Sequence, residues 1–137
     1  MNVLLDTNVI SALRRPAKDN TQVQTWASAT PVSTMFLSAI SILEIELGTL
    51  MIERKDPDRG RELRAWINEK IVPNFSQRIL PVDTAVAVRC ALLHVPQRRP
   101  DRDALIAATA LVHAMTVVTR NAVDFDPCDV TVFNPWD

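Results

Sequence analysis

Glycine is scarce in this chain of 137 residues, and its scarcity narrows the possible functions. Only Gly48 and Gly60 are present, so no glycine-rich loop is available to cradle a phosphate. That absence argues against P-loop and dinucleotide-binding proteins, whose turns need several glycines. A strong net charge is also missing, because 15 basic residues nearly balance 16 acidic ones. Any contact with a nucleic acid therefore has to use a local basic patch.

Cysteine is equally scarce, with only Cys90 and Cys128 in the chain. The first residues have a strand pattern and show no basic leader with a cleavage site. We therefore expect a cytoplasmic protein whose two thiols are buried and reduced. The longest mainly apolar stretch, 104–118, is too short to cross a bilayer and contains polar residues, so we expect no membrane contact.

Zinc and nucleophilic chemistry find little support in the sequence. His94 and His113 lie far apart and sit in helical patterns, which favours structural roles for both. No serine or cysteine lies in a strand-to-helix elbow of the kind that nucleophilic enzymes use. The functional groups must therefore be sought among other residue types.

Length and hydrophobic content indicate one domain, residues 1–137, with a full core. Hydrophobic residues make up 47% of the chain, which is enough to form a core without stabilising cross-links. Strand-like and helical patterns alternate along the sequence. Strands are expected at 2–5, 35–37, 78–82, 116–119 and 130–133. Helices are expected at 9–13 (ending before Arg14, Arg15 and Pro16), 21–28, 39 or 41 to 52, 63–71 (after a start signal at Pro57-Asp58), 83 or 84 to 93, and 101–115.

This alternation predicts an α/β fold, a three-layer α/β/α sandwich around a mainly parallel sheet of four to five strands. Two helices are expected to bury an apolar face against it. In the helix ending near 52, that face comprises Ile40, Leu43, Leu47 and Leu50, widened by Ile42 and Ile45. In the late helix it comprises Leu105, Ala108, Leu111, Val112 and Met115.

Four acidic residues fall at equivalent places in this pattern. Asp6 directly follows the first strand, and Glu44 lies in the first turns of the helix after the second. Asp103 lies in the first turn of the late helix, and Asp124 follows the strand at 116–119. Because the carboxyl ends of parallel strands share one edge of a sheet, where ligands bind in open α/β folds, these four side chains are expected to converge.

Each acid also has a purely structural interpretation. Asp6 can cap the following helix, and Glu44 has capping-box spacing from Ser41. Asp103 can simply favour the positive end of its helix, and Asp124 can be a turn residue. Together, however, four carboxylates without an adjacent Lys or Arg would repel one another. A divalent cation such as Mg²⁺ or Mn²⁺ offsets that repulsion, takes oxygen ligands and bridges to phosphate oxygens.

Polar and basic residues surround the predicted acidic site. The polar ones that could orient the carboxylates, or only cap helices and turns, are Thr7, Asn8, Thr119 and Asn121. The arginines that could form a rim holding a phosphate backbone, or only a solvated surface, are Arg14, Arg15, Arg99, Arg102 and Arg120.

At these residues the chain resembles a known family, the PIN-domain nucleases. The resemblance rests on Asp6-Thr7-Asn8, on Ser41 to Glu44, on Asp103 to Ala110, and on Thr119-Arg120-Asn121 followed by Asp124-Phe125. Order and spacing match over nearly the whole chain. Within the family the chain looks most like the VapC toxins of type II toxin–antitoxin systems, including the FitB-like branch.

The resemblance implies an endoribonuclease dependent on Mg²⁺ or Mn²⁺, which cleaves RNA phosphodiesters with a metal-activated water. Carried over by motif, the catalytic and metal-binding residues are Asp6, Glu44, Asp103 and Asp124. The family also implies a homodimer and inhibition by a VapB-type antitoxin.

Other functions remain open at this stage. A PIN-fold nuclease could instead process RNA, or the acids could be intact while the physiological role is binding. An acidic receiver domain would need a lysine near the last strand end, whereas the only lysines are Lys18, Lys55 and Lys70. A haloacid-dehalogenase-type phosphohydrolase would need a second aspartate two residues after the first, where this chain has Asn8.

Overall fold

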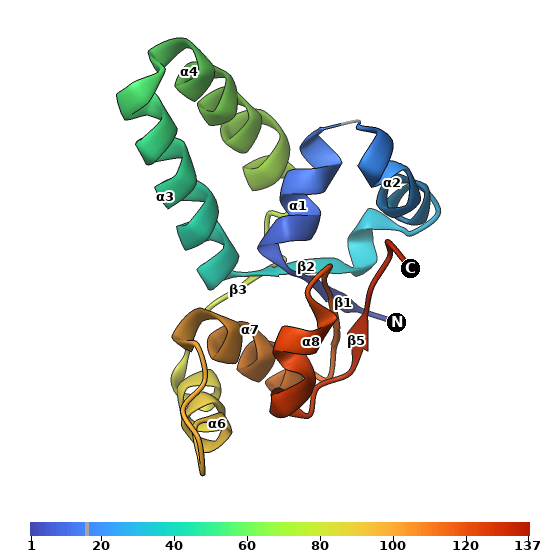
Figure 1. Cartoon of the computed structure of the whole chain (residues 1–137), viewed down its shortest axis with the longest axis vertical. Helices are drawn as coiled ribbons and strands as arrows, with labels where there is room; N and C mark the ends of the chain where they lie inside the picture. The colour runs from blue at the N-terminus through green and yellow to red at the C-terminus, as the bar shows by residue number, and fades with distance from the viewer. Residues whose placement is uncertain (16) are drawn as a thin grey trace.

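A five-stranded parallel sheet forms the centre of the molecule in the computed structural model, which describes residues 1–15 and 17–137 (Figure 1). The strands are β1 (Val3–Leu5), β2 (Met35–Ser38), β3 (Ile79–Leu80), β4 (Thr116–Val118) and β5 (Val132–Phe133). Their order is β3-β2-β1-β4-β5, and every pairing is parallel. The chain therefore builds the sheet outward in both directions from β1. The predicted α/β fold is confirmed.

Helices connect the strands and cover both faces of the sheet. The longer ones are α1 (Thr7–Arg14), α2 (Thr21–Ser28), α3 (Ala39–Lys55), α4 (Pro57–Trp66), α6 (Thr84–Leu93) and α7 (Asp101–Val112). The short ones are η1 (Lys18–Asn20), η2 (Val32–Thr34), the π-helix η3 (Ile67–Ile71), α5 (Val72–Asn74), α8 (Ala122–Phe125) and η4 (Asp126–Cys128). The expected end of the first helix at Pro16 falls outside the described residues.

The core is divided by the sheet into two layers, as a sandwich requires. On one face, Val3 and Leu5 of β1 pack with α1, α2 and the end of α4. On the other face, Leu4 packs with Ile106 of α7 and Phe125 of α8. Alternate residues of a fully buried strand thus serve opposite layers. Figure 1 shows α1 to α4 on one side of the sheet and α6 to α8 on the other.

The apolar face predicted for α7 is largely wrong. The helix ends at Val112, which is 38% exposed, and Leu105 and Leu111 are only half-buried. The buried residues are Ala104, Ile106, Ala107, Ala108, Thr109 and Ala110. Helix α7 lies between the sheet and α6, so small residues are buried on two sides of it. Met115 is buried beyond the helix end, in the cluster around Leu4.

The apolar face predicted for α3 is right for its isoleucines, since Ile45 is buried and Ile40 and Ile42 pack against the core, but wrong for its leucines. Leu43, Leu47 and Leu50 are 46%, 40% and 55% exposed, while Ser41, Ile45 and Thr49 are buried. The physical reason is the direction of the helix, because α3 and α4 form an antiparallel pair that extends away from the sheet (Figure 1). One face of this pair is therefore left uncovered by the residues that the structure describes.

Smaller boundary predictions are confirmed in part. Helix α4 begins at Pro57, as the start signal Pro57-Asp58 in the sequence predicts, and Asp56 caps it by accepting a hydrogen bond from the Arg59 amide. Pro73 does not end the helical path, since it occupies the start of α5. Strand β3 is limited to Ile79–Leu80, which leaves Pro81 outside the pairing.

Two sequence features have simple structural outcomes. Cys90 and Cys128 are free thiols, and both are buried. Within 1–15 and 17–137, every helix is too short or too polar to cross a membrane.

Candidate active site

The sheet order places the candidate site beside the central strand. The chain leaves β1 toward β2 and later returns to β4 on the other side of β1, so the strand order reverses between β1 and β4. Loops diverge at such a point and leave a crevice at the carboxyl ends of the strands. Asp6 follows β1, and Thr119 follows β4. The Asp6 amide donates to the Val118 carbonyl at 2.9 Å, which brings these two strand ends together.

Asp6 is held on both carboxylate oxygens. Its Oδ1 accepts from the Thr7 amide at 2.8 Å, so Asp6 is the N-cap of α1. Its Oδ2 accepts from Thr119 Oγ1 at 2.8 Å and from Asn8 Nδ2 at 3.2 Å. The capping interpretation is therefore correct for Oδ1, while Oδ2 is held by two side chains from the predicted polar set. With 7% exposure, the side chain is fixed in a single buried position.

A polar network orders the residues around Asp6. Asn8 Nδ2 also donates to Thr119 Oγ1 at 3.2 Å, and the Arg120 amide donates to Asn8 Oδ1 at the same distance. The Asn121 amide donates to Thr119 Oγ1 at 3.0 Å. These bonds join the start of α1 to the loop after β4.

Glu44 reaches the same edge from α3. Its Oε1 accepts from Thr7 Oγ1 at 2.7 Å, and Ser41 Oγ lies 3.1 Å from that hydroxyl. The capping-box interpretation of Glu44 is wrong, because Ser38 caps α3 by accepting from the Ile40 amide. Glu44 therefore lies beyond the first turn of α3, and its side chain faces Thr7.

The four predicted acids share one electrostatic neighbourhood. Burial raises the pKa of Asp6, and the charges of Glu44 and Asp124 raise it further, against the hydrogen bonds from Thr119 and Thr7. Burial also raises the pKa of Asp103, with further increases from Asp6, Asp124 and Glu44. The charges that raise the pKa of Asp6 and Asp103 thus come from acids that lie far apart in the sequence, as the parallel sheet predicts.

One detail of the expected acidic cluster is wrong. The sequence predicts no arginine beside the four carboxylates, yet Arg102 Nη1 lies 3.7 Å from Glu44 Oε2. The first turn of α7 places this guanidinium next to Asp103. Because Glu44 is 27% and Arg102 is 50% exposed, water weakens this ion pair. Arg102 therefore offsets part of the charge of Glu44, and the other three carboxylates have no such partner among the described residues.

The donor set fits a divalent cation. Carboxylates with hydroxyl and amide neighbours are the oxygen-rich surroundings that Mg²⁺ and Mn²⁺ prefer. Within the described residues, no three acidic, histidine or cysteine side chains are drawn closely enough together to enclose an ion. Burial, and to a smaller extent the neighbouring carboxylates, raises the pKa of Asp6 and Asp103, so a cation at this edge would favour their charged forms.

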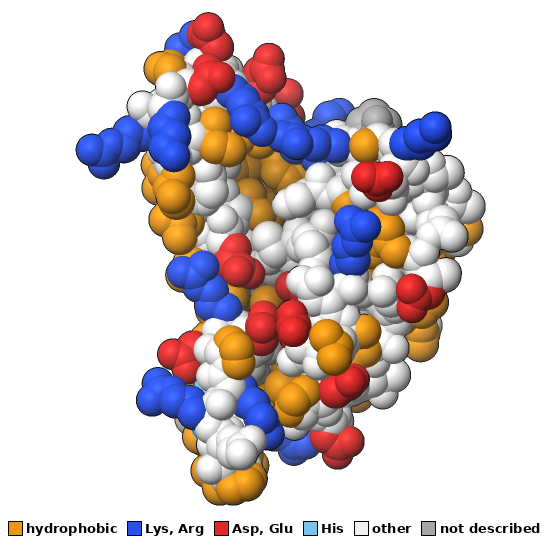
Figure 2. Space-filling view, in the orientation of Figure 1, with side chains coloured by type: hydrophobic (Ala, Val, Ile, Leu, Met, Phe, Trp, Pro, Cys, Tyr) orange, Lys and Arg blue, Asp and Glu red, His pale blue; other side chains and the backbone are white. Residues whose placement is uncertain are grey.

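The five predicted rim arginines do not share one location. Arg14, Arg15 and Arg120 line a hollow that also reaches Glu44, and Arg102 lies beside Glu44 itself. Arg99 lies elsewhere, because its backbone amide donates to His94 Nδ1 and its Nε is buried. Figure 2 shows acidic groups near the middle of this face with basic groups above them.

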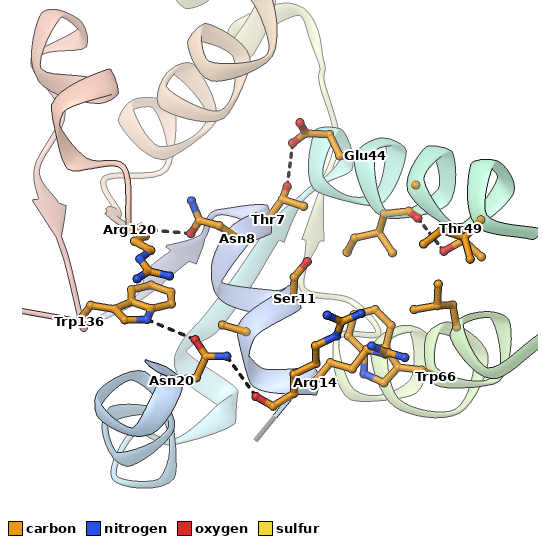
Figure 3. A pocket seen from close by; sticks show the side chains of 16 residues that line it. Thr7, Asn8, Ser11, Arg14, Asn20, Glu44, Thr49, Trp66, Arg120 and Trp136 are labelled. Atoms are coloured by element: carbon orange, nitrogen blue, oxygen red, sulfur yellow. Dashed lines mark hydrogen bonds between the residues drawn. The ribbon is translucent and has the colours of Figure 1, made fainter. Parts of the chain in front are cut away.

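Two tryptophans of the site escaped the sequence analysis. Trp66 and Trp136 line the same hollow, and each lies under an arginine. Neither tryptophan belongs to a sequence motif, and their place in the site follows only from their contacts in space with Arg14 and Arg120 (Figure 3).

Comparison with known proteins agrees with this geometry. A family model described as PIN domain matches residues 3–126. The chain is 37% identical to "Toxin FitB" of Neisseria gonorrhoeae over 139 residues, which cover 98% of both chains. It is 29% identical to "VapC ribonuclease Y4jK" of Sinorhizobium fredii over 140 residues, again 98% of both chains. The crystal structure of FitAcB from Neisseria gonorrhoeae superposes with a TM-score of 0.89, at 37% identity and 98% coverage of each chain.

Proposed function

This chain belongs to the PIN-domain family, with matches to its VapC-type, FitB-like toxins, and from that premise we propose that it is a divalent-metal-dependent endoribonuclease. In this proposal residues 1–137 act as one nuclease domain that hydrolyses RNA phosphodiester bonds in the cytoplasm. The observation that carries the proposal is the convergence of Asp6, Glu44, Asp103 and Asp124 in one electrostatic neighbourhood.

The four carboxylates would hold Mg²⁺ or Mn²⁺, the ions that their oxygen donors suit. When bound, the ion activates water and stabilises charge that develops on the phosphate oxygens. Asp6 is best prepared for this role, because Thr7, Asn8 and Thr119 fix both of its oxygens. Such supporting hydrogen bonds orient a ligand before the ion arrives.

The remaining side chains hold and orient the substrate. The Thr7 hydroxyl positions Glu44 by donating to its Oε1, and the Arg102 guanidinium lies beside its Oε2. In the proposal, the phosphate of the substrate approaches the site on this Arg102 side. The fork of a guanidinium matches the geometry of a phosphate. Asn8 and Thr119 keep the start of α1 against the loop after β4, so Asp6 and Asp124 stay on the same side of the crevice.

Cleavage of RNA tests this proposal. The purified protein should cleave RNA with Mg²⁺, lose the activity in EDTA and regain it when Mg²⁺ is restored. Asp103→Asn should reduce cleavage by at least a hundredfold while the circular dichroism spectrum stays unchanged. Full activity of Asp103→Asn, or of the wild type in EDTA, would reject the assignment.

We also propose a role in a toxin–antitoxin pair, with a VapB-type protein as the inhibitory partner. The support is the name of the Neisseria relative, which is called a toxin, and the matching FitAcB structure. Expression of the chain alone should arrest growth of the host, and co-expression of the small protein from the adjacent reading frame should restore it. Arrest that persists in Asp6→Asn would contradict a catalytic toxin.

A second copy of this chain is the proposed occupant of the exposed face of α3. Leu43, Leu47, Leu50 and Met51 lie at helical spacing and are between 40% and 57% exposed. Figure 2 shows hydrophobic groups along the edge of the molecule where Figure 1 places α3. A stripe of this kind suits an isologous contact, in which the same face of two copies meets.

Light scattering tests the homodimer. The wild type should have twice the monomer mass, and Leu47→Glu should shift it to the monomer. The control is Val32→Glu, which changes an apolar side chain of similar exposure on η2, away from this face. A monomeric wild type would reject the homodimer.

A further inference from the structure

The first turn of α7 carries two residues of the candidate site, but no side chain caps it. Arg102 and Asp103 lie in this turn, and the residue at the N-cap position is Pro100. Proline has no side-chain acceptor, whereas Ser, Thr, Asp or Asn would usually hold the start of a helix. The position of Asp103 therefore depends on other contacts around this turn.

Apolar packing brings α7 against α6 but does not fix its first turn. Val86 and Cys90 of α6 form one buried cluster with Ala104 and Ala108 of α7 (Figure 1). Hydrophobic contact has no preferred direction, so this cluster does not by itself set how far α7 lies along α6. A directional contact near the start of α7 is needed for that.

His94 makes such directional contacts. It is the C-cap residue of α6, and its Nδ1 accepts a hydrogen bond of 2.9 Å from the Arg99 amide. Its Nε2 lies 3.5 Å from Asp101 Oδ1 and 3.8 Å from Cys90 Sγ. The side chain is only 21% exposed. One imidazole thus links the end of α6, the loop 95–100 and the first residue of α7.

The bond to Arg99 determines which nitrogen of His94 carries the proton. A backbone amide can donate only to a ring nitrogen that has no hydrogen, so Nδ1 is the acceptor. The proton of the neutral ring therefore lies on Nε2. There it faces the Asp101 carboxylate and the Cys90 sulfur. Both nitrogens of the ring consequently have partners of the matching kind.

The other contact of Asp101 is much more exposed. Arg98 Nη2 lies 3.6 Å from Asp101 Oδ2, but the two side chains are 81% and 65% exposed, and ion pairs in such surroundings contribute little. Within residues 17–137, His94 is the only side chain that accepts a hydrogen bond from an amide of the loop 95–100. His94 is therefore the main side-chain connection between this loop and the end of α6.

We propose that His94 is a positioning residue that holds the first turn of α7 and thereby places Asp103 at the acidic site. The inference rests on the proposed nuclease function and adds a residue that supports it from outside the acidic cluster. The contacts of His94 are with Cys90, Arg99 and Asp101, so it acts on the site only through α7. Loss of a group that orients a metal-binding residue typically lowers metal affinity by roughly 10- to 100-fold.

Two substitutions of the same shape separate the hydrogen bond from the volume of the side chain. His94→Asn places an oxygen where Nδ1 lies and can accept from the Arg99 amide, whereas His94→Leu has the same branching without an acceptor. Isothermal titration with Mn²⁺ and cleavage of a labelled single-stranded RNA measure both variants. The Mn²⁺ affinity of His94→Asn should stay within about threefold of the wild type. That of His94→Leu should fall by about tenfold, with a matching loss of cleavage.

This order is the reverse of what a space-filling role would produce. Leucine suits the apolar cluster between α6 and α7 at least as well as asparagine does. The control is His113→Leu, because His113 is exposed at the other end of α7, and its Mn²⁺ affinity should match that of the wild type. Equal affinities of the two His94 variants, or weaker binding by His94→Asn, would overturn the proposal.

The tautomer of His94 tests the bond in the native side chain. The chain has only two histidines, so the His113→Leu protein shows the signals of His94 alone in a long-range ¹H–¹⁵N correlation spectrum. In metal-free buffer, at a pH where the ring is neutral, we expect only the Nε2–H tautomer. The Nδ1–H tautomer, or rapid exchange between the two forms, would overturn the bond to Arg99, even if neither His94 variant folds.

The outcomes separate this inference from the nuclease assignment. Mn²⁺ binding and RNA cleavage by the wild type, with equal values for His94→Asn and His94→Leu, would overturn the positioning role alone. A wild type that neither binds Mn²⁺ nor cleaves RNA would overturn the nuclease, and a single Nε2–H tautomer would then still show that His94 holds the loop before α7.

Discussion

Thr119 Oγ1 donates a hydrogen bond of 2.8 Å to Asp6 Oδ2, although 113 residues separate the two in sequence. The bond is buried and joins the ends of two adjacent parallel strands, β1 and β4. It fixes the oxygen of Asp6 that does not cap α1. This hydroxyl therefore holds the Asp6 carboxylate in place together with the Asn8 amide and the Thr7 backbone amide.

Removal of this hydroxyl should weaken metal binding. In Thr119→Val, Asp6 Oδ2 keeps only the Asn8 amide, so the carboxylate is less well oriented. Loss of such a support typically costs 10- to 100-fold in metal affinity or activity. Isothermal titration with Mn²⁺ measures the effect. Thr116→Val is the control, because it changes the threonine that begins β4, whose hydroxyl contacts Met1 Sδ, and its Mn²⁺ affinity should match that of the wild type.

Neutralising Asp6 should stabilise the protein in the absence of divalent ions. Burial and neighbouring charges raise the pKa of Asp6 above its ordinary value of 3.8. The folded state therefore binds this proton more tightly than the unfolded state, so ionisation of Asp6 costs stability as the pH rises through the folded pKa. Near pH 7, in EDTA, Asp6→Asn should melt at a higher temperature than the wild type.

The advantage of Asp6→Asn should depend on pH. It should shrink as the pH falls through the raised pKa and vanish below the ordinary value, where Asp6 is protonated in both states. Asp19→Asn removes one exposed carboxylate from η1 and serves as the control for loss of charge alone. An Asp6→Asn variant that melts below the wild type in EDTA at pH 7 would show that the carboxylate is not under electrostatic strain.

The two glycines provide a test of how α3 and α4 pack. A Cβ at Gly60 would lie 2.6 Å from the Glu53 Cα, so the close approach of α4 to α3 requires a glycine there. Gly60→Ala should destabilise the fold by about 1–3 kcal/mol. A Cβ at Gly48 would meet no atom within 4 Å, and alanine favours a helix interior, so Gly48→Ala should stabilise by about 1 kcal/mol. Chemical denaturation measures both, and effects of the same sign would contradict this packing.

The sequence predicts where the four acids lie in the fold because one rule governs their positions. Asp6, Glu44, Asp103 and Asp124 each follow a strand or begin a helix, and a parallel sheet gathers such positions at one edge. The supporting residues Thr7, Asn8 and Thr119 were found by the same rule. Their exact hydrogen bonds depend on the β1–β4 register, which the sequence does not encode locally.

Burial of the helices was harder to predict for a physical reason. Helical periodicity identifies an apolar stripe but not the surface that covers it. The stripe of Leu43, Leu47 and Leu50 is regular, yet α3 extends beyond the sheet, and this face remains exposed. In α7 the predicted leucines lie at the margin, because alanines permit the close approach of α6 on one side and the sheet on the other.

The positions of the arginines around the site were also hard to predict from the sequence. Proximity in sequence grouped Arg99 with Arg102, but the loop before α7 turns Arg99 toward His94, while α7 directs Arg102 toward Glu44. Trp136 lies near the chain end in a segment without periodicity. Its contact with Arg120 arises only from the way β5 returns beside β4.

Binding of Mn²⁺ tests the central claim, that the converging carboxylates hold a divalent ion, most directly. An ion that binds only the folded protein raises its melting temperature with concentration. Saturating Mn²⁺ should raise the melting temperature of the wild type and of Asp19→Asn by the same amount, and that of Asp6→Asn much less. Equal shifts in all three proteins would place the ion elsewhere and contradict the account.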